Sequence, residues 1–368
     1  MKPTFDVREL AVPGIRGLQP YQPGKPLEEL EREYGIRNAI KLASNENPLG
    51  PSPLALAAVQ NALGDLARYP DGSGILLKNA LAQKLGVLPA QITLGNGSND
   101  ILELAARIFV APGEKVLFSE YGFAIYPIAT QAVGGTAVIV PVRDWGHDLA
   151  AMRKALSPNI KLIFLANPNN PTGTWFNEQV LEEFLAAVPA QTIVLLDEAY
   201  FEYVTEPGYP DGLTLLPKYP NLVVTRTFSK IYGLAGLRVG YGISSPEIAD
   251  LFNRTRQPFN VNSLAQLAAI AALQDTAHFY RSREVNSDGM RQLMEGCARL
   301  GLVFIPSAAN FISVGLDRPG AQVYEALLRE GVIVRPLASY SMPRHVRVTI
   351  GVPEENRRFL AALGKILK

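Results

Sequence analysis

Short apolar runs alternate with longer amphipathic stretches through the middle of this chain. Seven apolar runs are predicted as buried strands: residues 91–94, 115–118, 136–140, 161–166, 192–196, 222–225 and 239–243. Apolar positions with helical spacing lie between several of them, for example at 98–110 and 178–188. Continuous apolar strands that alternate with helices are typical of a mainly parallel sheet covered by helices on both faces. The sequence therefore predicts an α/β fold with a large layered domain over residues 45–275.

The two ends of the chain have different patterns. Residues 1–44 are rich in proline and glycine, with one short helical patch at 27–34, and are predicted to form an arm that lies against other parts. Residues 276–368 begin with a helical stretch to about residue 299 and then mix short strands with helices. The strands are expected at 311–314, 332–336 and 346–350, and the helices at 321–330 and 354–367. This order predicts a smaller α+β domain beside the large one.

Composition and charge exclude several classes of protein. Of the 368 residues, 48% are hydrophobic and 19% charged, enough apolar material for a large core. Lys and Arg total 35 against 34 Asp and Glu, a balance that excludes a nucleic-acid binder acting by bulk charge. No run approaches the roughly 18 apolar residues of a membrane span, and Asp6 and Arg8 interrupt any signal-peptide core. The single cysteine, Cys297, suits a reducing compartment. We therefore expect a cytoplasmic protein without nucleic-acid or membrane partners and, with three scattered histidines, without a metal site.

Polar clusters follow four of the predicted strands at the point where each strand ends. These clusters are residues 95–99, 167–173, 197–200 and 227–230. Open α/β sheets bind ligands outside the carboxyl ends of their strands. We therefore expect the four clusters to line one crevice.

Three residues in this crevice are candidates for chemistry. Burial at the end of a strand lowers the pKa of a lysine such as Lys230 from about 10.4 toward about 7–8, where it forms imines readily. Asp197 ends an apolar run, so its carboxylate needs a partner, either a helix cap, a structural ion pair or a protonated pyridine nitrogen. Tyr200, three positions on, would place its hydroxyl near the same ligand.

The turn at 95–99 leads into a helix, and exposed N–H groups at such a helix start bind anions. Ser229 and Arg238 can add a charge-assisted clamp on the same phosphate. In the loop at 167–173, two prolines would fix Asn170 as a hydrogen-bond donor. An imine-forming lysine, a pyridinium partner, a phenol, an amide and a phosphate cradle together predict a pyridoxal phosphate site.

The chain resembles the fold-type I aminotransferases over nearly its whole length. The resemblance rests on Asn170-Pro171-Thr172-Gly173, Asp197-x-x-Tyr200, Ser229-Lys230 and Arg238, in that order. It implies that Lys230 binds the coenzyme covalently and moves the substrate proton, while Asp197 keeps the pyridine nitrogen protonated. It also implies that Tyr200 and Asn170 hold the phenolic oxygen of the coenzyme.

The same resemblance assigns the remaining coenzyme contacts. The coenzyme phosphate would be held by Ser98, Asn99, Thr227, Ser229 and Arg238. Tyr121 would stack on the ring, and Tyr69 would reach the coenzyme phosphate of a partner subunit. The match at Tyr69 implies a homodimer with shared sites. Asn99 departs from the acid that many members carry there, which affects only a side-chain contact.

Residues 21–26 and 41–50 are similar to the histidinol-phosphate aminotransferase branch of that family. This implies that small molecules are the substrates: L-histidinol phosphate and 2-oxoglutarate would be interconverted with imidazole acetol phosphate and L-glutamate. Tyr21 would cover the imidazole and Asn47 would contact the substrate. Arg335 and Arg347 would grip the substrate phosphate, and Arg347 would bind the glutamate carboxylate in the other half-reaction.

Other functions remain open at this stage. An aromatic amino-acid aminotransferase, or a decarboxylase of a phosphorylated amino acid, would use the same coenzyme residues. A non-catalytic sensor of a transcription regulator would need a DNA-binding extension, and residues 1–44 are too short and proline-rich for a helix-turn-helix. A nicotinamide dehydrogenase would leave Lys230, Asp197 and Tyr200 unexplained, and Ile101 and Leu102 stand where its third glycine would fall.

Overall fold

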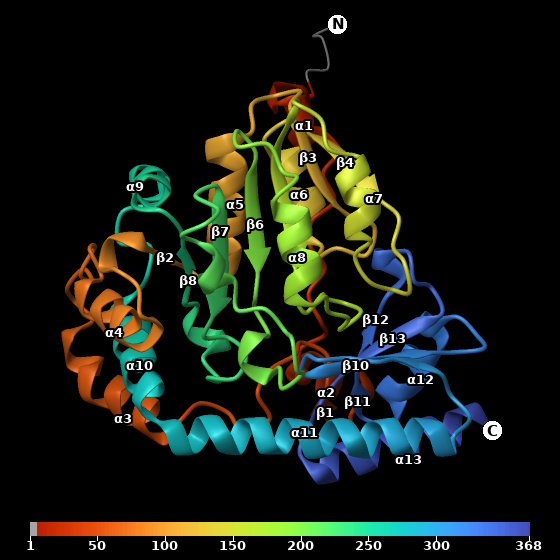
Figure 1. The fold of residues 1–368 in the computed structure, drawn as a ribbon. Coiled ribbons are helices and arrows are strands. Elements are labelled where there is room, and N and C mark those ends of the chain that lie inside the picture. Colours follow the sequence, from red (N-terminus) through yellow and green to blue (C-terminus); the bar gives the residue numbers. More distant parts are fainter. Residues whose placement is uncertain (1–5) are drawn as a thin grey trace, which may run out of the picture.

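A seven-stranded sheet forms the centre of the protein in a computed structural model that describes residues 6–368 (Figure 1). The first five residues of the predicted arm lie outside the described residues. The strands are β2 (Ile92–Gly95), β3 (Lys115–Ser119), β4 (Thr136–Val140), β5 (Ile160–Ala166), β6 (Ile193–Asp197), β7 (Leu222–Thr227) and β8 (Gly240–Ile243). Their order is β2-β8-β7-β6-β5-β3-β4. The neighbouring pairs from β7 to β4 in this order are all parallel. β8 is antiparallel to both of its neighbours, so the predicted mainly parallel sheet is confirmed with one reversed strand.

Helices cover both faces of this sheet, because successive side chains of each strand point to opposite sides. In β6, Val194 and Leu196 are packed in one hydrophobic core and Leu195 in the other. The first core also includes residues of α3 (Pro53–Ala62), α4 (Ile75–Leu85), α7 (Leu149–Lys154), α8 (Glu178–Leu185) and α10 (Ser263–Gln274). The second includes residues of α5 (Ser98–Phe109), α6 (Ile125–Ala132) and α9 (Pro246–Thr255). Figure 1 shows α8 in front of the sheet and α5 behind it.

A second, antiparallel sheet is formed by the C-terminal part of the chain. Its order is β12-β13-β10-β9, with β9 (Phe304–Ile305), β10 (Phe311–Gly315), β12 (Arg335–Pro336) and β13 (His345–Thr349). The helices α12 (Gly320–Arg329) and α13 (Pro353–Leu367) share a third hydrophobic core with it. The strand predicted at 332–336 is in fact two strands. β11 (Val332–Ile333) pairs in parallel with β1 (Ile40–Lys41), and only β12 belongs to the four-stranded antiparallel sheet.

The helix α11 (Thr276–Arg299) begins at the predicted boundary between the two domains and runs beneath both sheets (Figure 1). Near its start Phe279 packs against the first core of the large sheet, whereas Leu293 and Cys297 lie in the C-terminal core. This helix therefore links the two parts through continuous backbone hydrogen bonds. The boundaries at 44/45 and 275/276 stay predictions.

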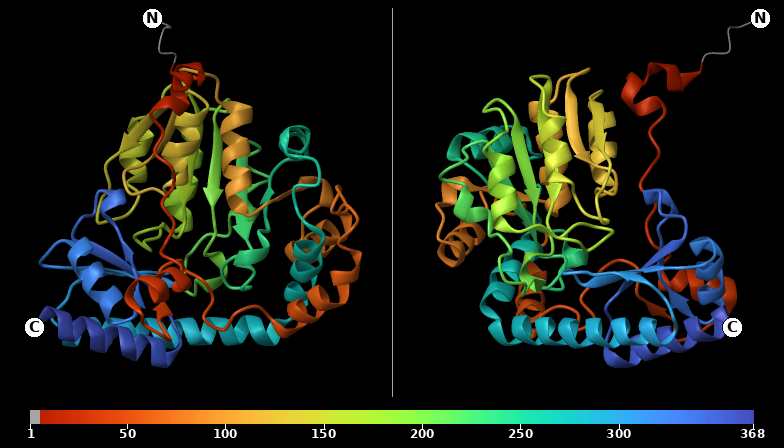
Figure 2. Two further views of the ribbon diagram at one scale, coloured as in Figure 1. Left: turned by 180° about the vertical axis from the view of Figure 1, so that it is seen from behind. Right: turned by 45° about the vertical axis from the view of Figure 1, so that its right-hand side comes forward.

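The N-terminal arm follows the surface from α6 to α12, as the two views of Figure 2 show. Its helix α1 (Pro13–Arg16) lies so close to α6 that a Cβ on Gly14 would be 2.0 Å from the carbonyl oxygen of Gln131. Its second helix, α2 (Leu27–Tyr34), buries Leu30 against Leu328 of α12 and Ile333 of β11. Between the two helices the arm passes the ends of the central strands.

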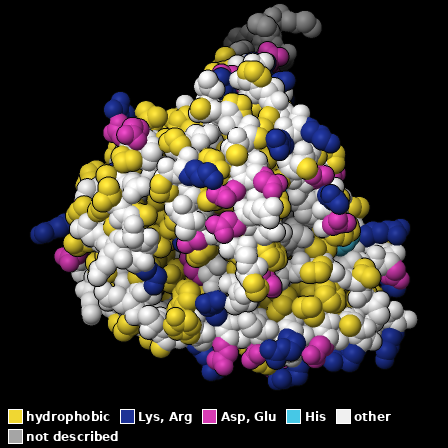
Figure 3. Space-filling view, in the orientation of Figure 1, with side chains coloured by type: hydrophobic (Ala, Val, Ile, Leu, Met, Phe, Trp, Pro, Cys, Tyr) yellow, Lys and Arg dark blue, Asp and Glu magenta, His cyan; other side chains and the backbone are white. Residues whose placement is uncertain are grey.

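Acidic and basic side chains are interspersed over the face shown in Figure 3. Of the helices within residues 6–368, none has both the length and the apolar composition needed to cross a bilayer.

Candidate active site

A cavity of about 230 Å³ lies where the carboxyl ends of the central strands meet α5, the arm and β13. The structure brings most of the predicted site residues to its wall. These are Tyr21, Ser98, Asn99, Asn170, Asp197, Tyr200, Thr227, Ser229, Lys230, Arg238 and Arg347. The four polar clusters that follow the strands therefore do converge on one crevice, as predicted.

Lys230 follows β7 and extends into this cavity. Its Nζ donates a hydrogen bond to the carbonyl oxygen of Ser44 at 3.3 Å and lies 5.6 Å from the ring centre of Tyr200. Burial lowers the pKa of Lys230 to about 8, and the positive charge of Arg347 acts in the same direction. At pH 7 about a tenth of this amine is therefore uncharged and able to act as a nucleophile or a base, far more than for an ordinary lysine.

Asp197 is the last residue of β6 and is buried with no cation paired to its carboxylate at hydrogen-bond distance among the described residues. Its Oδ2 accepts a hydrogen bond from the Tyr126 hydroxyl at 3.1 Å, and its Oδ1 accepts bonds from the backbone N–H of Ala199 and the hydroxyl of Thr225. Burial raises the pKa of Asp197 to about 6, against the effect of these donors. A carboxylate in this state is suited to a ligand that brings a proton on a ring nitrogen.

A chain of hydrogen bonds fixes the next side of the cavity. Asn45 donates through Nδ2 to the Tyr200 hydroxyl at 2.8 Å. Arg347 donates through one terminal nitrogen to Oδ1 of Asn170 and through the other to the carbonyl oxygen of Ala43 at 2.9 Å. The Nε of Arg347 is buried without a partner within residues 6–368. Because a buried unpaired N–H is costly, this guanidinium is set up to bind an anion that enters the cavity.

The far end of the cavity is built from the start of α5. Gly97 precedes the helix with φ of 86°, and a Cβ there would be 2.4 Å from a terminal nitrogen of Arg238. Arg238 in turn donates to the hydroxyl of Ser229 at 3.4 Å. A helix N-terminus, a guanidinium and a hydroxyl at one place form an anion site, and the glycine keeps it compact.

Arg335 does not line this cavity but a neighbouring one of about 410 Å³. Tyr21 belongs to both, and the Arg335 guanidinium lies 5.6 Å from its ring centre. The side chain of Tyr21, in the arm, therefore lies between the Lys230 cavity and a second pocket, whose charged lining residues are Arg335 and Glu120. This pocket also contains hydroxyl groups, from Ser339, Tyr340 and Ser341.

Three predicted residues are placed elsewhere by the structure. Tyr121 lies outside the Lys230 cavity, because its ring stacks on Trp145 at 5.9 Å. Asn47 uses its amide on the carbonyl oxygen of Ile231 at 2.7 Å and the hydroxyl of Ser282 at 2.9 Å. Tyr69 is 84% exposed and stacks on Phe259, away from the cavity of its own subunit. Ring stacking by Tyr121, substrate contact by Asn47 and the reach of Tyr69 to a partner subunit stay predictions.

Sequence reasoning missed two residues that line the cavity where those two were expected. Phe123 lies at the wall instead of Tyr121, two positions away in the same turn. Asn45 lies there instead of Asn47, although both belong to the same Asn-Glu-Asn-Pro stretch. In both cases the residue type was recognisable, but the direction of a side chain in an irregular segment follows from tertiary contacts.

The chain matches a known protein family. Residues 37–363 match the family described as aminotransferase class I and II. The match spans most of the chain, so the protein belongs to the aminotransferase class I and II family.

Its relatives indicate one branch of that family. The chain is 58% identical to histidinol-phosphate aminotransferase 1 of Nitrosococcus oceani, over 98% of this chain and 97% of the relative. It is 59% identical to histidinol-phosphate aminotransferase 2 of Pseudomonas fluorescens, over 98% of each chain. Its fold is similar to the crystal structure of histidinol-phosphate aminotransferase from Sinorhizobium meliloti in complex with pyridoxal-5'-phosphate. That structure has a TM-score of 0.90 at 32% identity, over 97% of both chains.

Proposed function

We propose that this protein is a pyridoxal-phosphate-dependent aminotransferase that interconverts L-histidinol phosphate and 2-oxoglutarate with imidazole acetol phosphate and L-glutamate. The observation that carries the proposal is the pair of adjoining pockets, one with Lys230 and Arg347 and one with Arg335, divided by Tyr21. The names of the relatives at 58% and 59% identity support the same substrates.

The residues of the cavity fit pyridoxal phosphate. Its aldehyde would meet Lys230, its ring nitrogen Asp197, its phenolic oxygen Tyr200 and Asn170, and its phosphate the start of α5 with Arg238. When bound, the coenzyme supplies an aldehyde that condenses with amines and a protonated ring that withdraws electrons from the α-carbon of the substrate. Phe123 lines the same cavity and would be an aromatic neighbour of the ring in addition to the predicted Tyr121.

Lys230 provides the base that moves the proton of the substrate. With a pKa of about 8 its amine can take a proton from the α-carbon and return it nearby without a large free-energy penalty. Arg347 would hold the carboxylate of glutamate through the guanidinium edge whose Nε has no protein partner within residues 6–368. Asp197, at the buried end of β6, would hold the proton on the ring nitrogen.

The two pockets explain how one site could accept two different substrates. Glutamate carries a second carboxylate, whereas histidinol phosphate carries a phosphate and an imidazole. The phosphate would extend to Arg335 and its neighbouring hydroxyls, and Tyr21 would cover the imidazole at the junction. Guanidinium groups suit both anions because their planar fork makes paired hydrogen bonds to carboxylate or phosphate.

We also propose that the active protein is a homodimer in which Tyr69 reaches the coenzyme phosphate of the partner subunit. Its exposed ring is held by Phe259 at 4.9 Å, which keeps it ordered on the surface. Large apolar side chains are also exposed on α3, α4, α10 and the segment between α3 and α4, namely Leu54, Leu56, Leu63, Leu66, Ile75, Leu76 and Leu267. Exposed apolar side chains on helices that pack together are consistent with a protein interface. The cytoplasm is the proposed location, supported by the single cysteine, which is free and buried.

The substrate assignment is tested by measuring kcat/KM of the purified protein with 2-oxoglutarate and each of histidinol phosphate, tyrosine and phenylalanine. The kcat/KM for histidinol phosphate is expected to be at least about 100-fold higher than for tyrosine or phenylalanine. An amino donor without a phosphate would leave the buried guanidinium of the phosphate pocket without an anion. Similar values for all three amines would favour an aromatic aminotransferase. Release of carbon dioxide without a new keto acid would favour a decarboxylase.

The Arg335→Gln variant provides the internal control for this assignment. It is expected to lower kcat/KM for histidinol phosphate and to leave the half-reaction with glutamate almost unchanged. Equal losses in the two half-reactions would contradict the separate roles of the two pockets.

A further inference from the structure

One polar side chain at the site has no role in the chemistry described so far. Tyr126, in α6, has 0% of its surface exposed, and its hydroxyl donates to Oδ2 of Asp197 at 3.1 Å. It does not line the Lys230 cavity but lies behind the carboxylate. A buried hydroxyl needs a partner, and this one is paired with the carboxylate that faces the coenzyme position.

The ring of Tyr126 is held in place by aromatic contacts. It stacks on Phe164 of β5 with centres 4.6 Å apart and planes 3° apart. Phe123, at the cavity wall, packs edge-on against it at 6.0 Å. These contacts restrict the position of the hydroxyl, and the same ring supports Phe123 at the cavity wall.

The bond from Tyr126 is the shortest of the three that the Asp197 side chain accepts. The Ala199 N–H and the Thr225 hydroxyl are 3.3 and 3.4 Å away and both bind Oδ1. With Oδ2 oriented by Tyr126 and Oδ1 by the other two, the remaining lone pairs have defined directions.

The titratable groups around this pair are few. Asp197 faces Tyr126, Tyr200 and Lys230, and Tyr126 faces Asp197, Tyr200 and Tyr340. Burial raises the pKa of Tyr126, so its hydroxyl keeps its proton and remains a donor. Burial also raises the pKa of Asp197 to about 6, and the bond from Tyr126 lowers it. Loss of the hydroxyl would therefore favour the protonated carboxyl, which cannot bind a protonated ring nitrogen.

We propose that Tyr126 is a positioning residue that keeps the Asp197 carboxylate ionised and directed toward the ring nitrogen of the coenzyme. The inference rests on the proposed function and adds to it a residue that acts through Asp197 without touching the coenzyme.

The test compares the holoenzyme with its Tyr126→Phe variant, which loses one oxygen atom. The fraction of pyridoxal phosphate retained after dialysis is measured as a function of pH. For Tyr126→Phe the midpoint of coenzyme loss on acidification is expected about one pH unit higher, because a hydrogen bond to a charged group has been removed. The kcat is expected to fall about tenfold while KM for glutamate stays within about twofold.

Tyr241→Phe is the matched control. Tyr241 is a buried tyrosine on β8, 2% exposed, and is not among the donors to Asp197. This variant should retain the wild-type midpoint and kcat. If Tyr126→Phe behaves in the same way as Tyr241→Phe, the inference is overturned.

A double-mutant cycle separates this role from a general packing effect. On an Asp197→Asn background the change Tyr126→Phe should no longer alter coenzyme retention, since the ionised carboxylate is gone. An equal loss on both backgrounds would overturn the inference. A wild-type protein that retains no coenzyme at any pH would contradict the proposed function itself, a result distinct from both.

Discussion

Burial shifts the pKa values of the two central residues of the site in opposite directions. It lowers the pKa of Lys230 to about 8 and raises that of Asp197 to about 6. In both cases the charged form is disfavoured because it has lost water. The shifts leave an amine that can exchange protons near neutrality beside a carboxylate that needs a proton-bearing ligand.

The pKa of Lys230 predicts how the rate of coenzyme capture depends on pH. Protein freed of coenzyme should capture pyridoxal phosphate covalently at a rate that falls about tenfold for each pH unit below about 8. The neutral amine is the reactive form, and its fraction decreases as pH drops below the pKa. The rate is measured from the growth of the visible absorption band after mixing.

Arg347 provides the control for this pH dependence. Its charge contributes to the low pKa of Lys230, so Arg347→Met should move the midpoint to higher pH. A capture rate that stays constant between about pH 6 and about pH 9 would contradict the assigned state of the amine.

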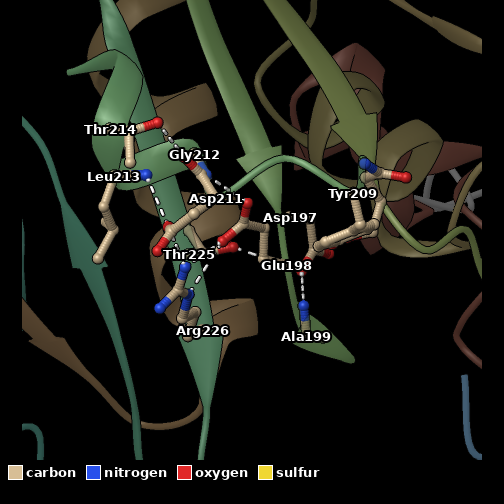
Figure 4. Close-up of polar contacts among 11 residues, drawn as sticks. Asp197, Glu198, Ala199, Tyr209, Asp211, Gly212, Leu213, Thr214, Thr225 and Arg226 are labelled. Atoms are coloured by element: carbon tan, nitrogen blue, oxygen red, sulfur yellow. Dashed lines mark hydrogen bonds and ion pairs between the residues drawn. The ribbon is translucent and has the colours of Figure 1, made fainter. Parts of the chain in front are cut away.

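At the scale of elements, β6 and β7 hold the site through a buried ion pair on the side opposite the cavity. Glu198 Oε2 accepts from Arg226 at 2.7 Å, and Arg226 also pairs with Asp211 at 2.6 Å (Figure 4). Asp197 and Glu198 are neighbours, so one faces the cavity and the other this pair. The pair therefore connects the strand end that carries Asp197 to the strand that leads to Lys230.

Arg226→Met should lower the free energy of unfolding by about 3 kcal/mol at neutral pH, because it leaves Glu198 buried without its cation. Burial raises the pKa of Glu198 to about 7 even beside Arg226, and removal of that charge should raise it further. Because the folded wild type already binds this proton below about pH 7, the pH-dependent part of the defect should appear above about pH 7 and vanish as pH falls below it.

Urea titration at several pH values measures this loss. The exposed pair Lys218–Glu182 is the control, and Lys218→Met should cost less than about 1 kcal/mol. A loss of similar size in both variants would contradict the role given to the buried pair.

A second prediction at this scale concerns the start of α5. A Cβ on Gly240 of β8 would be 2.4 Å from the backbone nitrogen of Ser98 and would push the helix N-terminus out of place. Gly240→Ala should therefore weaken binding of pyridoxal phosphate by about tenfold or more, measured by equilibrium dialysis. Gly236→Ala, where nothing lies within 4 Å of the added Cβ, should bind as the wild type does. Equal affinities for the two variants would contradict the phosphate role of α5.

The regular elements were predictable because their patterns are local. All seven strands expected in residues 91–243 occur, and α5 begins at Ser98 as predicted. Residues 332–336 were the exception, since a short apolar run does not reveal that its two halves pair with different partners. The reversal of β8 depends on the connection from β7, which the apolar pattern alone does not report.

The candidate site was predictable where residues end strands and less so in loops. Lys230, Asp197 and Ser98 follow strands whose direction was expected, and all three line the cavity. Phe123 lies in an irregular turn, and Tyr126 lies in the helix that follows it. The direction of the aromatic side chains in this segment depends on tertiary contacts, such as those of Tyr121 with Trp145 and of Tyr126 with Phe164.

At the scale of the whole molecule, the active site is proposed to be shared between two subunits. Mixing Tyr69→Ala with Lys230→Ala should then restore activity, because a hybrid dimer contains one site with Lys230 from one subunit and Tyr69 from its partner. Random exchange would return about a quarter of the wild-type activity, as half of the dimers are hybrids and half of their sites are intact. Activity after mixing that stays at the sum of the two variants would contradict the shared site.

The residue that binds the coenzyme can be identified directly. The purified protein is loaded with pyridoxal phosphate, reduced with borohydride, digested and examined by mass spectrometry. One modified peptide is expected, carrying the phosphopyridoxyl group on Lys230, and it should be absent when histidinol phosphate is added before reduction. Modification of a different lysine, or a protein that remains colourless and unmodified, would contradict the role given to Lys230.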